Sequence, residues 1–331
     1  MSSNKSNVLI TRSATNVLRI LFEALVLFHH LFDANISWLN DIDSICGPTA
    51  VSGFLLISGF GLGMRYKKDG EKYLGSLLKK RIPTTYFHLV LTNVCYLALF
   101  FICGESFDNA FSFIISVLYL PVFKDFVYLS NWVYFLADLL LYYVMFLLFG
   151  WLMRKKKNAL LKSALWVFAL QALVVLVLEC INASTGSAKA MRGCFLFPIG
   201  LICANFNEVV ADFVKEYKYL VVAMFFSLGC VGMHFMDSNF MFEYVTSACF
   251  CMGIVCLFHG FNFETPGLAL GAKAVLFVYL SHEFALKFFR HIMQGADWWL
   301  HSLFAIDIVV CLAFLYVALI VKRKGRKKLK I

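Results

Sequence analysis

Three polar side chains in the first long apolar run, Arg19, Glu23 and His30, have the types and the spacing of a chemical site. Each residue of an α-helix turns about 100°, so these side chains lie within about 40° of one another on one face. The same geometry separates Arg19 from His30 by about 16 Å along the helix axis. A guanidinium binds anionic groups, and an imidazole titrates near neutrality and can act as a general base. This stripe predicts a site for an anionic carrier that binds at Arg19 and presents its reactive end near His30.

Other ionisable residues interrupt later apolar runs, among them His282. Because a charge inside a bilayer costs about 3 kcal/mol or more, such residues mark functional sites more often than charged residues elsewhere do. The competing interpretation of the stripe is an interhelical hydrogen-bond network that only holds the helices together. Gly59 and Gly63 form a GxxxG spacing, which predicts close helix packing rather than ligand contact.

The composition identifies the solvent that surrounds these elements. Of the 331 residues, 61% are hydrophobic and 15% are charged, whereas soluble globular chains are about half apolar and about a quarter charged. Too few polar residues remain to cover a soluble domain, so we expect an all-α, polytopic helix bundle in a membrane. The 11 cysteines lie mostly inside apolar runs without zinc-ligand spacing. We interpret them as small buried hydrophobes, and we expect neither a metal site nor a bound cofactor.

A membrane-spanning helix needs about 20 apolar residues. We expect ten spans, at 14–34, 46–64, 82–103, 132–153, 159–180, 193–206, 219–236, 240–259, 271–289 and 300–321. Lys and Arg concentrate in cytoplasmic loops, and ten spans with both termini in the cytoplasm place most of the 30 basic residues on that side. An eleventh apolar run, at 110–121, is interpreted as half-inserted, because a full crossing there would move the basic run at 154–157 outside.

Residues 1–331 are therefore predicted to form a single integral-membrane domain. The basic tail at 322–331 directly follows the last span. We interpret this tail as a cytoplasmic anchor on anionic membrane lipid rather than as a nucleic-acid patch.

Five segments, taken in order, resemble the bacterial membrane acyltransferase 3 family. The segment LRILFEALVLFHH is similar to that family's Arg-x10-His signature, and AVSGFLLISGFGLG is similar to its GV-x-x-F-F-x-x-SGF segment. The segments YLGSLLKKRIPTTY, NWVYFLADLLLYY and VYLSHEFAL resemble its basic loop, its middle span and a segment near its end. One position departs from the family. Where the family often has Arg-x-x-Arg before the third span, Arg81 is followed three residues later by Thr84.

The resemblance implies ten membrane helices in the inner (cytoplasmic) membrane of a bacterium. It also implies an O-acyltransferase that moves an acyl group, most often acetyl from acetyl-CoA, to a hydroxyl of an envelope or exported carbohydrate. Acetyl-CoA or another acyl-CoA is then a co-substrate, and the partners are a carbohydrate acceptor and membrane lipid. The identity of the acceptor is left open, and the transferred group can be succinyl instead of acetyl. The alternative function is a multi-span transporter or flippase for a carbohydrate or lipid-linked substrate.

Acyl transfer to a hydroxyl requires a base, because a hydroxyl is a poor nucleophile until its proton is removed. We assign His30 as the catalytic base and expect Glu23 or a nearby carboxylate to orient it. Arg19, Lys80 and Arg81 are expected to bind the phosphates of CoA. A covalent acyl-His30 intermediate is an open alternative to direct transfer.

Four residues are secondary candidates. Ser58 and His282 are candidates for binding the acceptor or for stabilising an oxyanion. Trp132 and Tyr134 are candidates for stacking on a sugar ring, although interfacial aromatic residues usually anchor a helix.

Overall fold

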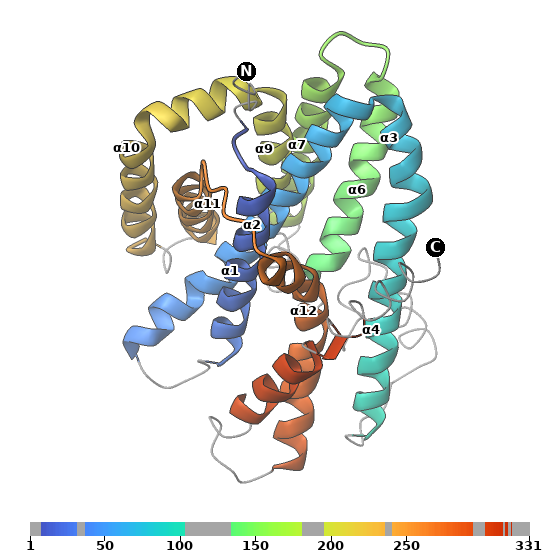
Figure 1. Cartoon of the computed structure of the whole chain (residues 1–331), viewed down its shortest axis with the longest axis vertical. Coiled ribbons are helices and arrows are strands. Elements are labelled where there is room, and N and C mark those ends of the chain that lie inside the picture. Colours follow the sequence, from blue (N-terminus) through green and yellow to red (C-terminus); the bar gives the residue numbers. More distant parts are fainter. Residues whose placement is uncertain are drawn as a thin grey trace.

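The computed structural model describes residues 8–31, 37–102, 134–180, 195–235, 240–293 and 302–313, together with Leu315, Tyr316 and Leu319. Every regular element in these ranges is a helix (Figure 1). The helices are α1 (Arg12–Leu31), α2 (Ser37–Asp69), α3 (Glu71–Ser76), the π-helical turn η1 (Leu77–Arg81), α4 (Ile82–Ile102), α6 (Tyr134–Met153), α7 (Ala159–Cys180), α9 (Leu196–Asn205), α10 (Asn207–Met233), α11 (Phe240–Leu257), α12 (Pro266–Ile292) and a last helix at Ser302–Ala313. The all-α prediction is confirmed for this part of the chain.

Each of the ten predicted spans coincides with a described helix. The largest difference in bounds is at α10, which begins at Asn207, whereas the span is predicted to start at residue 219. The first turns of α10 are polar on one side, and its backbone is kinked at Tyr217, where φ is −111° and ψ is 25°. The predicted span covers only the part after this kink, because the segment before the kink is not a long apolar run. The run at 110–121 and the tail at 322–331 lie outside the described residues.

Four stretches are long and apolar enough to cross a bilayer by length and composition, namely Ile45–Asp69, Glu71–Leu99, Phe135–Met153 and Asn207–Met233. A bent pair, Pro266–His282 with Phe284–Ile292, makes a fifth. The outer faces of α6, α7 and α10 expose large apolar side chains such as Leu148, Leu176 and Val231. Lipid is the solvent that such surfaces require. The chain is a helical membrane protein, and its count of ten spans stays a prediction.

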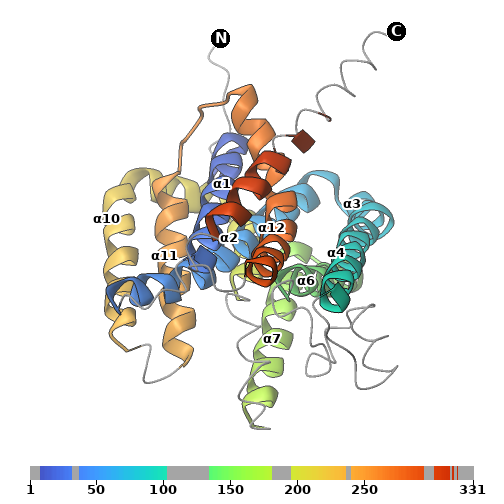
Figure 2. The same ribbon diagram turned by 90° about the horizontal axis from the view of Figure 1, so that it is seen from below.

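Helices α1, α2 and α12 lie at the centre of the bundle (Figures 1 and 2). Helices α10 and α11 lie on one side of this centre, and α4 and α6 lie on the other. Helix α2 packs against α1, α9 and α11, and α1 also packs against α12. The polar stripe of α1 therefore lies among the central helices, with α2 and α12 as its neighbours.

The contact of α2 with α9 depends on small residues. A Cβ placed on Gly59 would overlap the carbonyl oxygen of Phe197, and one on Gly63 would lie 2.6 Å from the Cβ of Ala204. Gly200 of α9 approaches the backbone of α2 in the same way. The prediction that the GxxxG spacing serves helix packing is confirmed, and this close contact fixes α2 in the core.

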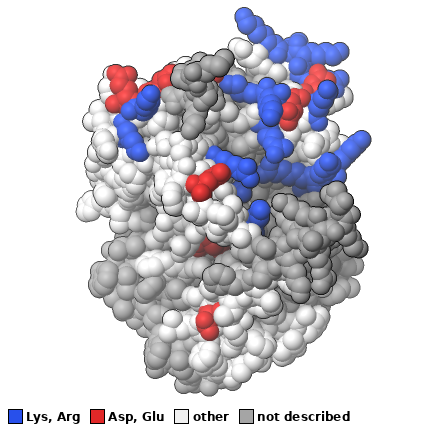
Figure 3. All heavy atoms as spheres, viewed as in Figure 1, with Lys and Arg blue, Asp and Glu red and all other residues white. Residues whose placement is uncertain are grey.

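One end of the described bundle is basic. Figure 3 shows Lys and Arg gathered on the upper part of the face seen in Figure 1, with few charges below. This end includes Arg65, Lys67 and Lys68 at the end of α2, and the turn after α6 with its run at 154–157. The positive-inside rule predicts that such an end faces the cytoplasm. The placement of both termini in the cytoplasm stays a prediction.

Candidate active site

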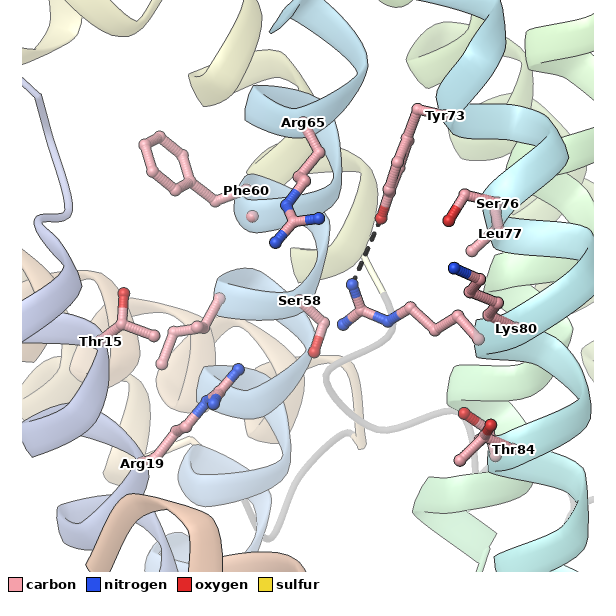
Figure 4. A pocket seen from close by; sticks show the side chains of 14 residues that line it. Thr15, Arg19, Ser58, Phe60, Arg65, Tyr73, Ser76, Leu77, Lys80 and Thr84 are labelled. Carbon is pink, nitrogen blue, oxygen red and sulfur yellow. Dashed lines mark hydrogen bonds between the residues drawn. The ribbon is translucent and has the colours of Figure 1, made fainter. Parts of the chain in front are cut away.

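A basic pocket of about 480 Å³ opens between α1, α2, η1 and α4 at this end. Among the residues that the structure describes, its walls include four cationic side chains and no carboxylate. The lining residues are Thr15, Arg19, Ile57, Ser58, Phe60, Gly61, Arg65, Tyr73, Ser76, Leu77, Lys80, Arg81, Thr84 and Thr85. Figure 4 shows Arg19, Arg65 and Lys80 directed into the space that these helices enclose. Such a cavity attracts a ligand with several negative charges, because several positive charges close together stabilise an anion placed among them.

A local change in helix type occurs where η1 and α4 line the pocket. The π-helical turn at Leu77–Arg81 follows α3 and precedes α4 without an intervening loop. Single π-helical turns are rare and are frequent at functional sites. Leu77, Arg81 and Thr85 follow one another at four-residue intervals, and all three line the pocket.

Arg81 is held by two tyrosines. Its guanidinium donates a hydrogen bond to the hydroxyl of Tyr73 at 3.3 Å. Its Cζ lies 4.8 Å from the ring centroid of Tyr143 of α6, in a cation-π contact. The Tyr143 hydroxyl also hydrogen-bonds to Ser58. These contacts fix the orientation of Arg81 before any ligand binds, which lowers the entropy lost on binding.

The structure brings together the three predicted phosphate-binding residues, Arg19, Lys80 and Arg81, and it adds Arg65. Arg65 was not among the residues predicted for the site. A signal was present, because Arg65 follows Ser58 by seven residues, and residues seven apart share a helix face to within about 20°. Helix α2 continues to Asp69, beyond the predicted end of its span at residue 64, so this face extends to the pocket.

The other end of the stripe meets a second histidine. Helices α1 and α12 run parallel. Ile20 of α1 lies 3.1 Å from a Cβ placed on Gly271 of α12, and further along both helices the ring centroids of His30 and His282 are 5.0 Å apart. The ring of His29 lies 5.0 Å from that of His30 and packs on Gly47 of α2, where a Cβ would be 2.7 Å away. The histidines therefore cluster between α1, α2 and α12.

The predicted contact between Glu23 and His30 is not present. Glu23 is 4% exposed, and neither of its carboxylate oxygens has a hydrogen-bond partner among the described residues. Seven residues separate Glu23 from His30, which is about 10.5 Å along a helix. Sharing a face was therefore not sufficient for contact, and the rings beside His30 are those of His29 and His282.

The secondary candidates divide in the same way. Ser58 lies in the basic pocket, and His282 lies beside His30. Trp132 lies outside the described residues, and Tyr134 begins α6 with a side chain that is likewise outside the description. The structure thus shows two centres on α1, a basic pocket around Arg19 and a histidine cluster around His30.

The family model for the acyltransferase 3 domain matches residues 12–322, nearly the whole chain. The chain belongs to the acyltransferase 3 family. No curated protein and no solved structure matches it. The protein is therefore a membrane acyltransferase, and the transporter alternative is not favoured. Both centres lie within the matched region.

Proposed function

We propose that this acyltransferase transfers an acetyl group from cytoplasmic acetyl-CoA to a hydroxyl of an envelope or exported carbohydrate, in the inner membrane of a bacterium. The observation that carries the proposal is the pocket with Arg19, Arg65, Lys80 and Arg81, which no carboxylate lines in the described part of the chain. CoA presents a diphosphate and a further phosphate, and planar guanidinium groups bind such oxyanions through paired, charge-assisted hydrogen bonds.

The two centres of α1 fit the shape of this donor. CoA carries its thioester at the end of a long, flexible pantetheine arm, away from its phosphates. With phosphates at Arg19, the thioester extends toward His30, about 16 Å further along the helix. Binding energy gained at the remote phosphates then holds the thioester in place for reaction.

The reaction at the second centre is proton removal from the acceptor hydroxyl and transfer of the acetyl group. His30 takes part either as the base in direct transfer or as the nucleophile that carries the acetyl group. Succinyl transfer would use the same two centres. The carbohydrate acceptor approaches His30 from the side opposite to the basic end.

The test uses purified protein with acetyl-CoA labelled in the acetyl group. We expect label in an ester with a sugar hydroxyl, and we expect His30→Ala to lose this activity while it accumulates in membranes at the normal level. The matched control is His88→Ala on α4, since His88 lies outside both centres. Full activity of His30→Ala, or movement of a substrate without covalent change, would refute the proposal.

The acceptor is then found by mass spectrometry of envelope glycans from cells with and without the protein. Loss of an acetyl increment from one glycan identifies both the group and its acceptor. Loss of a succinyl increment would change the donor and leave the site assignment intact.

A further inference from the structure

His282 is a buried base beside His30. It lies on α12 and is 2% exposed, and its ring centroid is 5.0 Å from that of His30 with an interplanar angle of 33°. Tyr279 flanks it one turn earlier, at 5.8 Å between ring centroids. The ring is therefore buried on α12 and lies beside the residue to which the chemistry is assigned.

The hydrogen bonding of His282 fixes which nitrogen carries the proton. Its Nδ1 lies 3.2 Å from the carbonyl oxygen of Val278. A carbonyl oxygen only accepts, so Nδ1 must donate, and in the neutral ring Nε2 is left with a lone pair. This Nε2 is buried and has no partner in the part of the chain that the structure describes. A buried acceptor without a partner calls for a ligand that donates to it.

This geometry decides between the two roles expected of His282. An oxyanion needs a hydrogen-bond donor, but the donor of the neutral ring is already used by Val278. Nε2 can only accept, and the reactant that offers a proton is the acceptor hydroxyl.

We propose that Nε2 of His282 takes the proton of the acceptor hydroxyl while His30 carries the acyl group. This inference rests on the proposed function and divides the work of its second centre between two residues. The division has a chemical reason. A histidine that holds an acyl group has its nucleophilic nitrogen in a covalent bond, so the following step requires a different base.

The two steps balance. First, a ring nitrogen of His30 attacks the thioester carbon, so that an N–C bond forms, the C–S bond breaks and the electron pair leaves with the sulfur as CoA thiolate. Next, the acceptor oxygen attacks the same carbon, so that an O–C bond forms and the N–C bond breaks, returning its electron pair to His30. The hydroxyl proton passes to Nε2 of His282 and then through water to the thiolate. The sum is a thioester and an alcohol giving an ester and a thiol.

The other groups near His30 are less well placed for this role. His29 packs against Gly47 of α2, where a Cβ would lie 2.7 Å from its ring. Glu23 is about 10.5 Å from His30 along the helix, which is beyond direct proton transfer. His282 combines a short separation from His30 with an unpartnered lone pair.

His282→Asn is the sharpest variant, because an asparagine amide can still donate to the Val278 carbonyl while the Nε2 lone pair is lost. Two reactions of the purified protein are compared. One is exchange of labelled CoA into acetyl-CoA, and the other is acetyl transfer to octyl β-glucoside and to water. A thiol with a pKa of about 8.5 needs little help to ionise at pH 8, whereas a hydroxyl needs a base. We expect transfer to fall about 10²- to 10⁴-fold and exchange to change by less than about threefold.

The matched control is His88→Asn, whose Nδ1 makes the same type of bond, to the carbonyl oxygen of Thr84 at 2.6 Å. It should leave both reactions unchanged, and His30→Ala should lose both. Retained exchange in His282→Asn also shows that the variant is folded.

Equal loss of both reactions in His282→Asn, or unimpaired transfer, would overturn this inference alone. Absence of exchange in the unaltered protein that still forms the ester would overturn acyl-His30 and this inference, but not the proposed function. The proposed function fails if the unaltered protein shows neither exchange nor transfer.

Discussion

The contact between Tyr73 and Arg81 makes a quantitative prediction about donor binding. The Tyr73 hydroxyl accepts from Arg81 at 3.3 Å, which is a long hydrogen bond. A neutral hydrogen bond contributes about 0.5–1.5 kcal/mol net and one to a charged group about 1.5–3 kcal/mol. At 1.4 kcal/mol per factor of ten, Tyr73→Phe is expected to raise the KM for acetyl-CoA by about two- to fivefold, since its bond is long. Arg81→Gln, which removes a bond to a phosphate, should raise it by about 10- to 150-fold.

The double variant provides the decisive comparison. If Tyr73 acts only by orienting Arg81, Tyr73→Phe has nothing left to disturb in the Arg81→Gln protein. The KM of the double variant should then equal that of Arg81→Gln to within about twofold, a failure of additivity that marks coupled residues. The kcat should stay the same in all three variants, because phosphate contacts are equally present in the ground state and the transition state.

The assay is the initial rate of acetyl transfer as a function of donor concentration, in detergent or in lipid discs. S-acetyl-pantetheine serves as the control donor, since it lacks the phosphates of the nucleotide, and its KM should not respond to either substitution. Independent, multiplying effects in the double variant would show that Tyr73 contacts the donor directly. An equal rise of KM for both donors would refute phosphate binding in this pocket.

Two further predictions concern residues of α2. Arg65→Gln should raise the KM for acetyl-CoA by a few-fold, which is about what one partly screened charge contributes. Lys68→Gln removes an equal charge outside the pocket and should not raise the KM. Equal effects of the two substitutions would indicate a nonspecific surface field. Gly59→Ala should lower the melting temperature or prevent accumulation, because its Cβ would meet the carbonyl oxygen of Phe197, and Gly61→Ala, with nothing within 4 Å, should not. Equal melting temperatures for the two alanine variants would contradict the close packing of α2 on α9.

Local sequence was sufficient for properties that depend on a single helix. The apolar runs located the helices, and the bounds of α7 agree with the prediction to the residue. The common face of Arg19, Glu23 and His30 follows from helical periodicity alone. Run length failed at the start of α10, because the amphipathic segment before the kink at Tyr217 contains no long apolar run.

Contacts between helices were beyond the reach of the sequence. It assigned Glu23 to His30 because both share a face, but about 10.5 Å of helix lies between them. It named His282 without a partner, and only the parallel packing of α12 on α1 sets the two imidazoles side by side. Arg65 joined the site only because α2 extends beyond the apolar run.

Composition and helical periodicity were sufficient to establish that this protein is helical, that its solvent is lipid, and that α1 carries a cation and an imidazole on one face. These are properties of composition and of the 3.6-residue turn, so neighbouring residues suffice to set them. The tertiary structure decided which side chains share a pocket. It gathered Arg19, Arg65, Lys80 and Arg81 and set Tyr73 and Tyr143 against Arg81. It also left the Nε2 of His282 without a partner in the described structure. The register and direction of packed helices arise from side-chain fit between segments distant in sequence, and no local pattern encodes them.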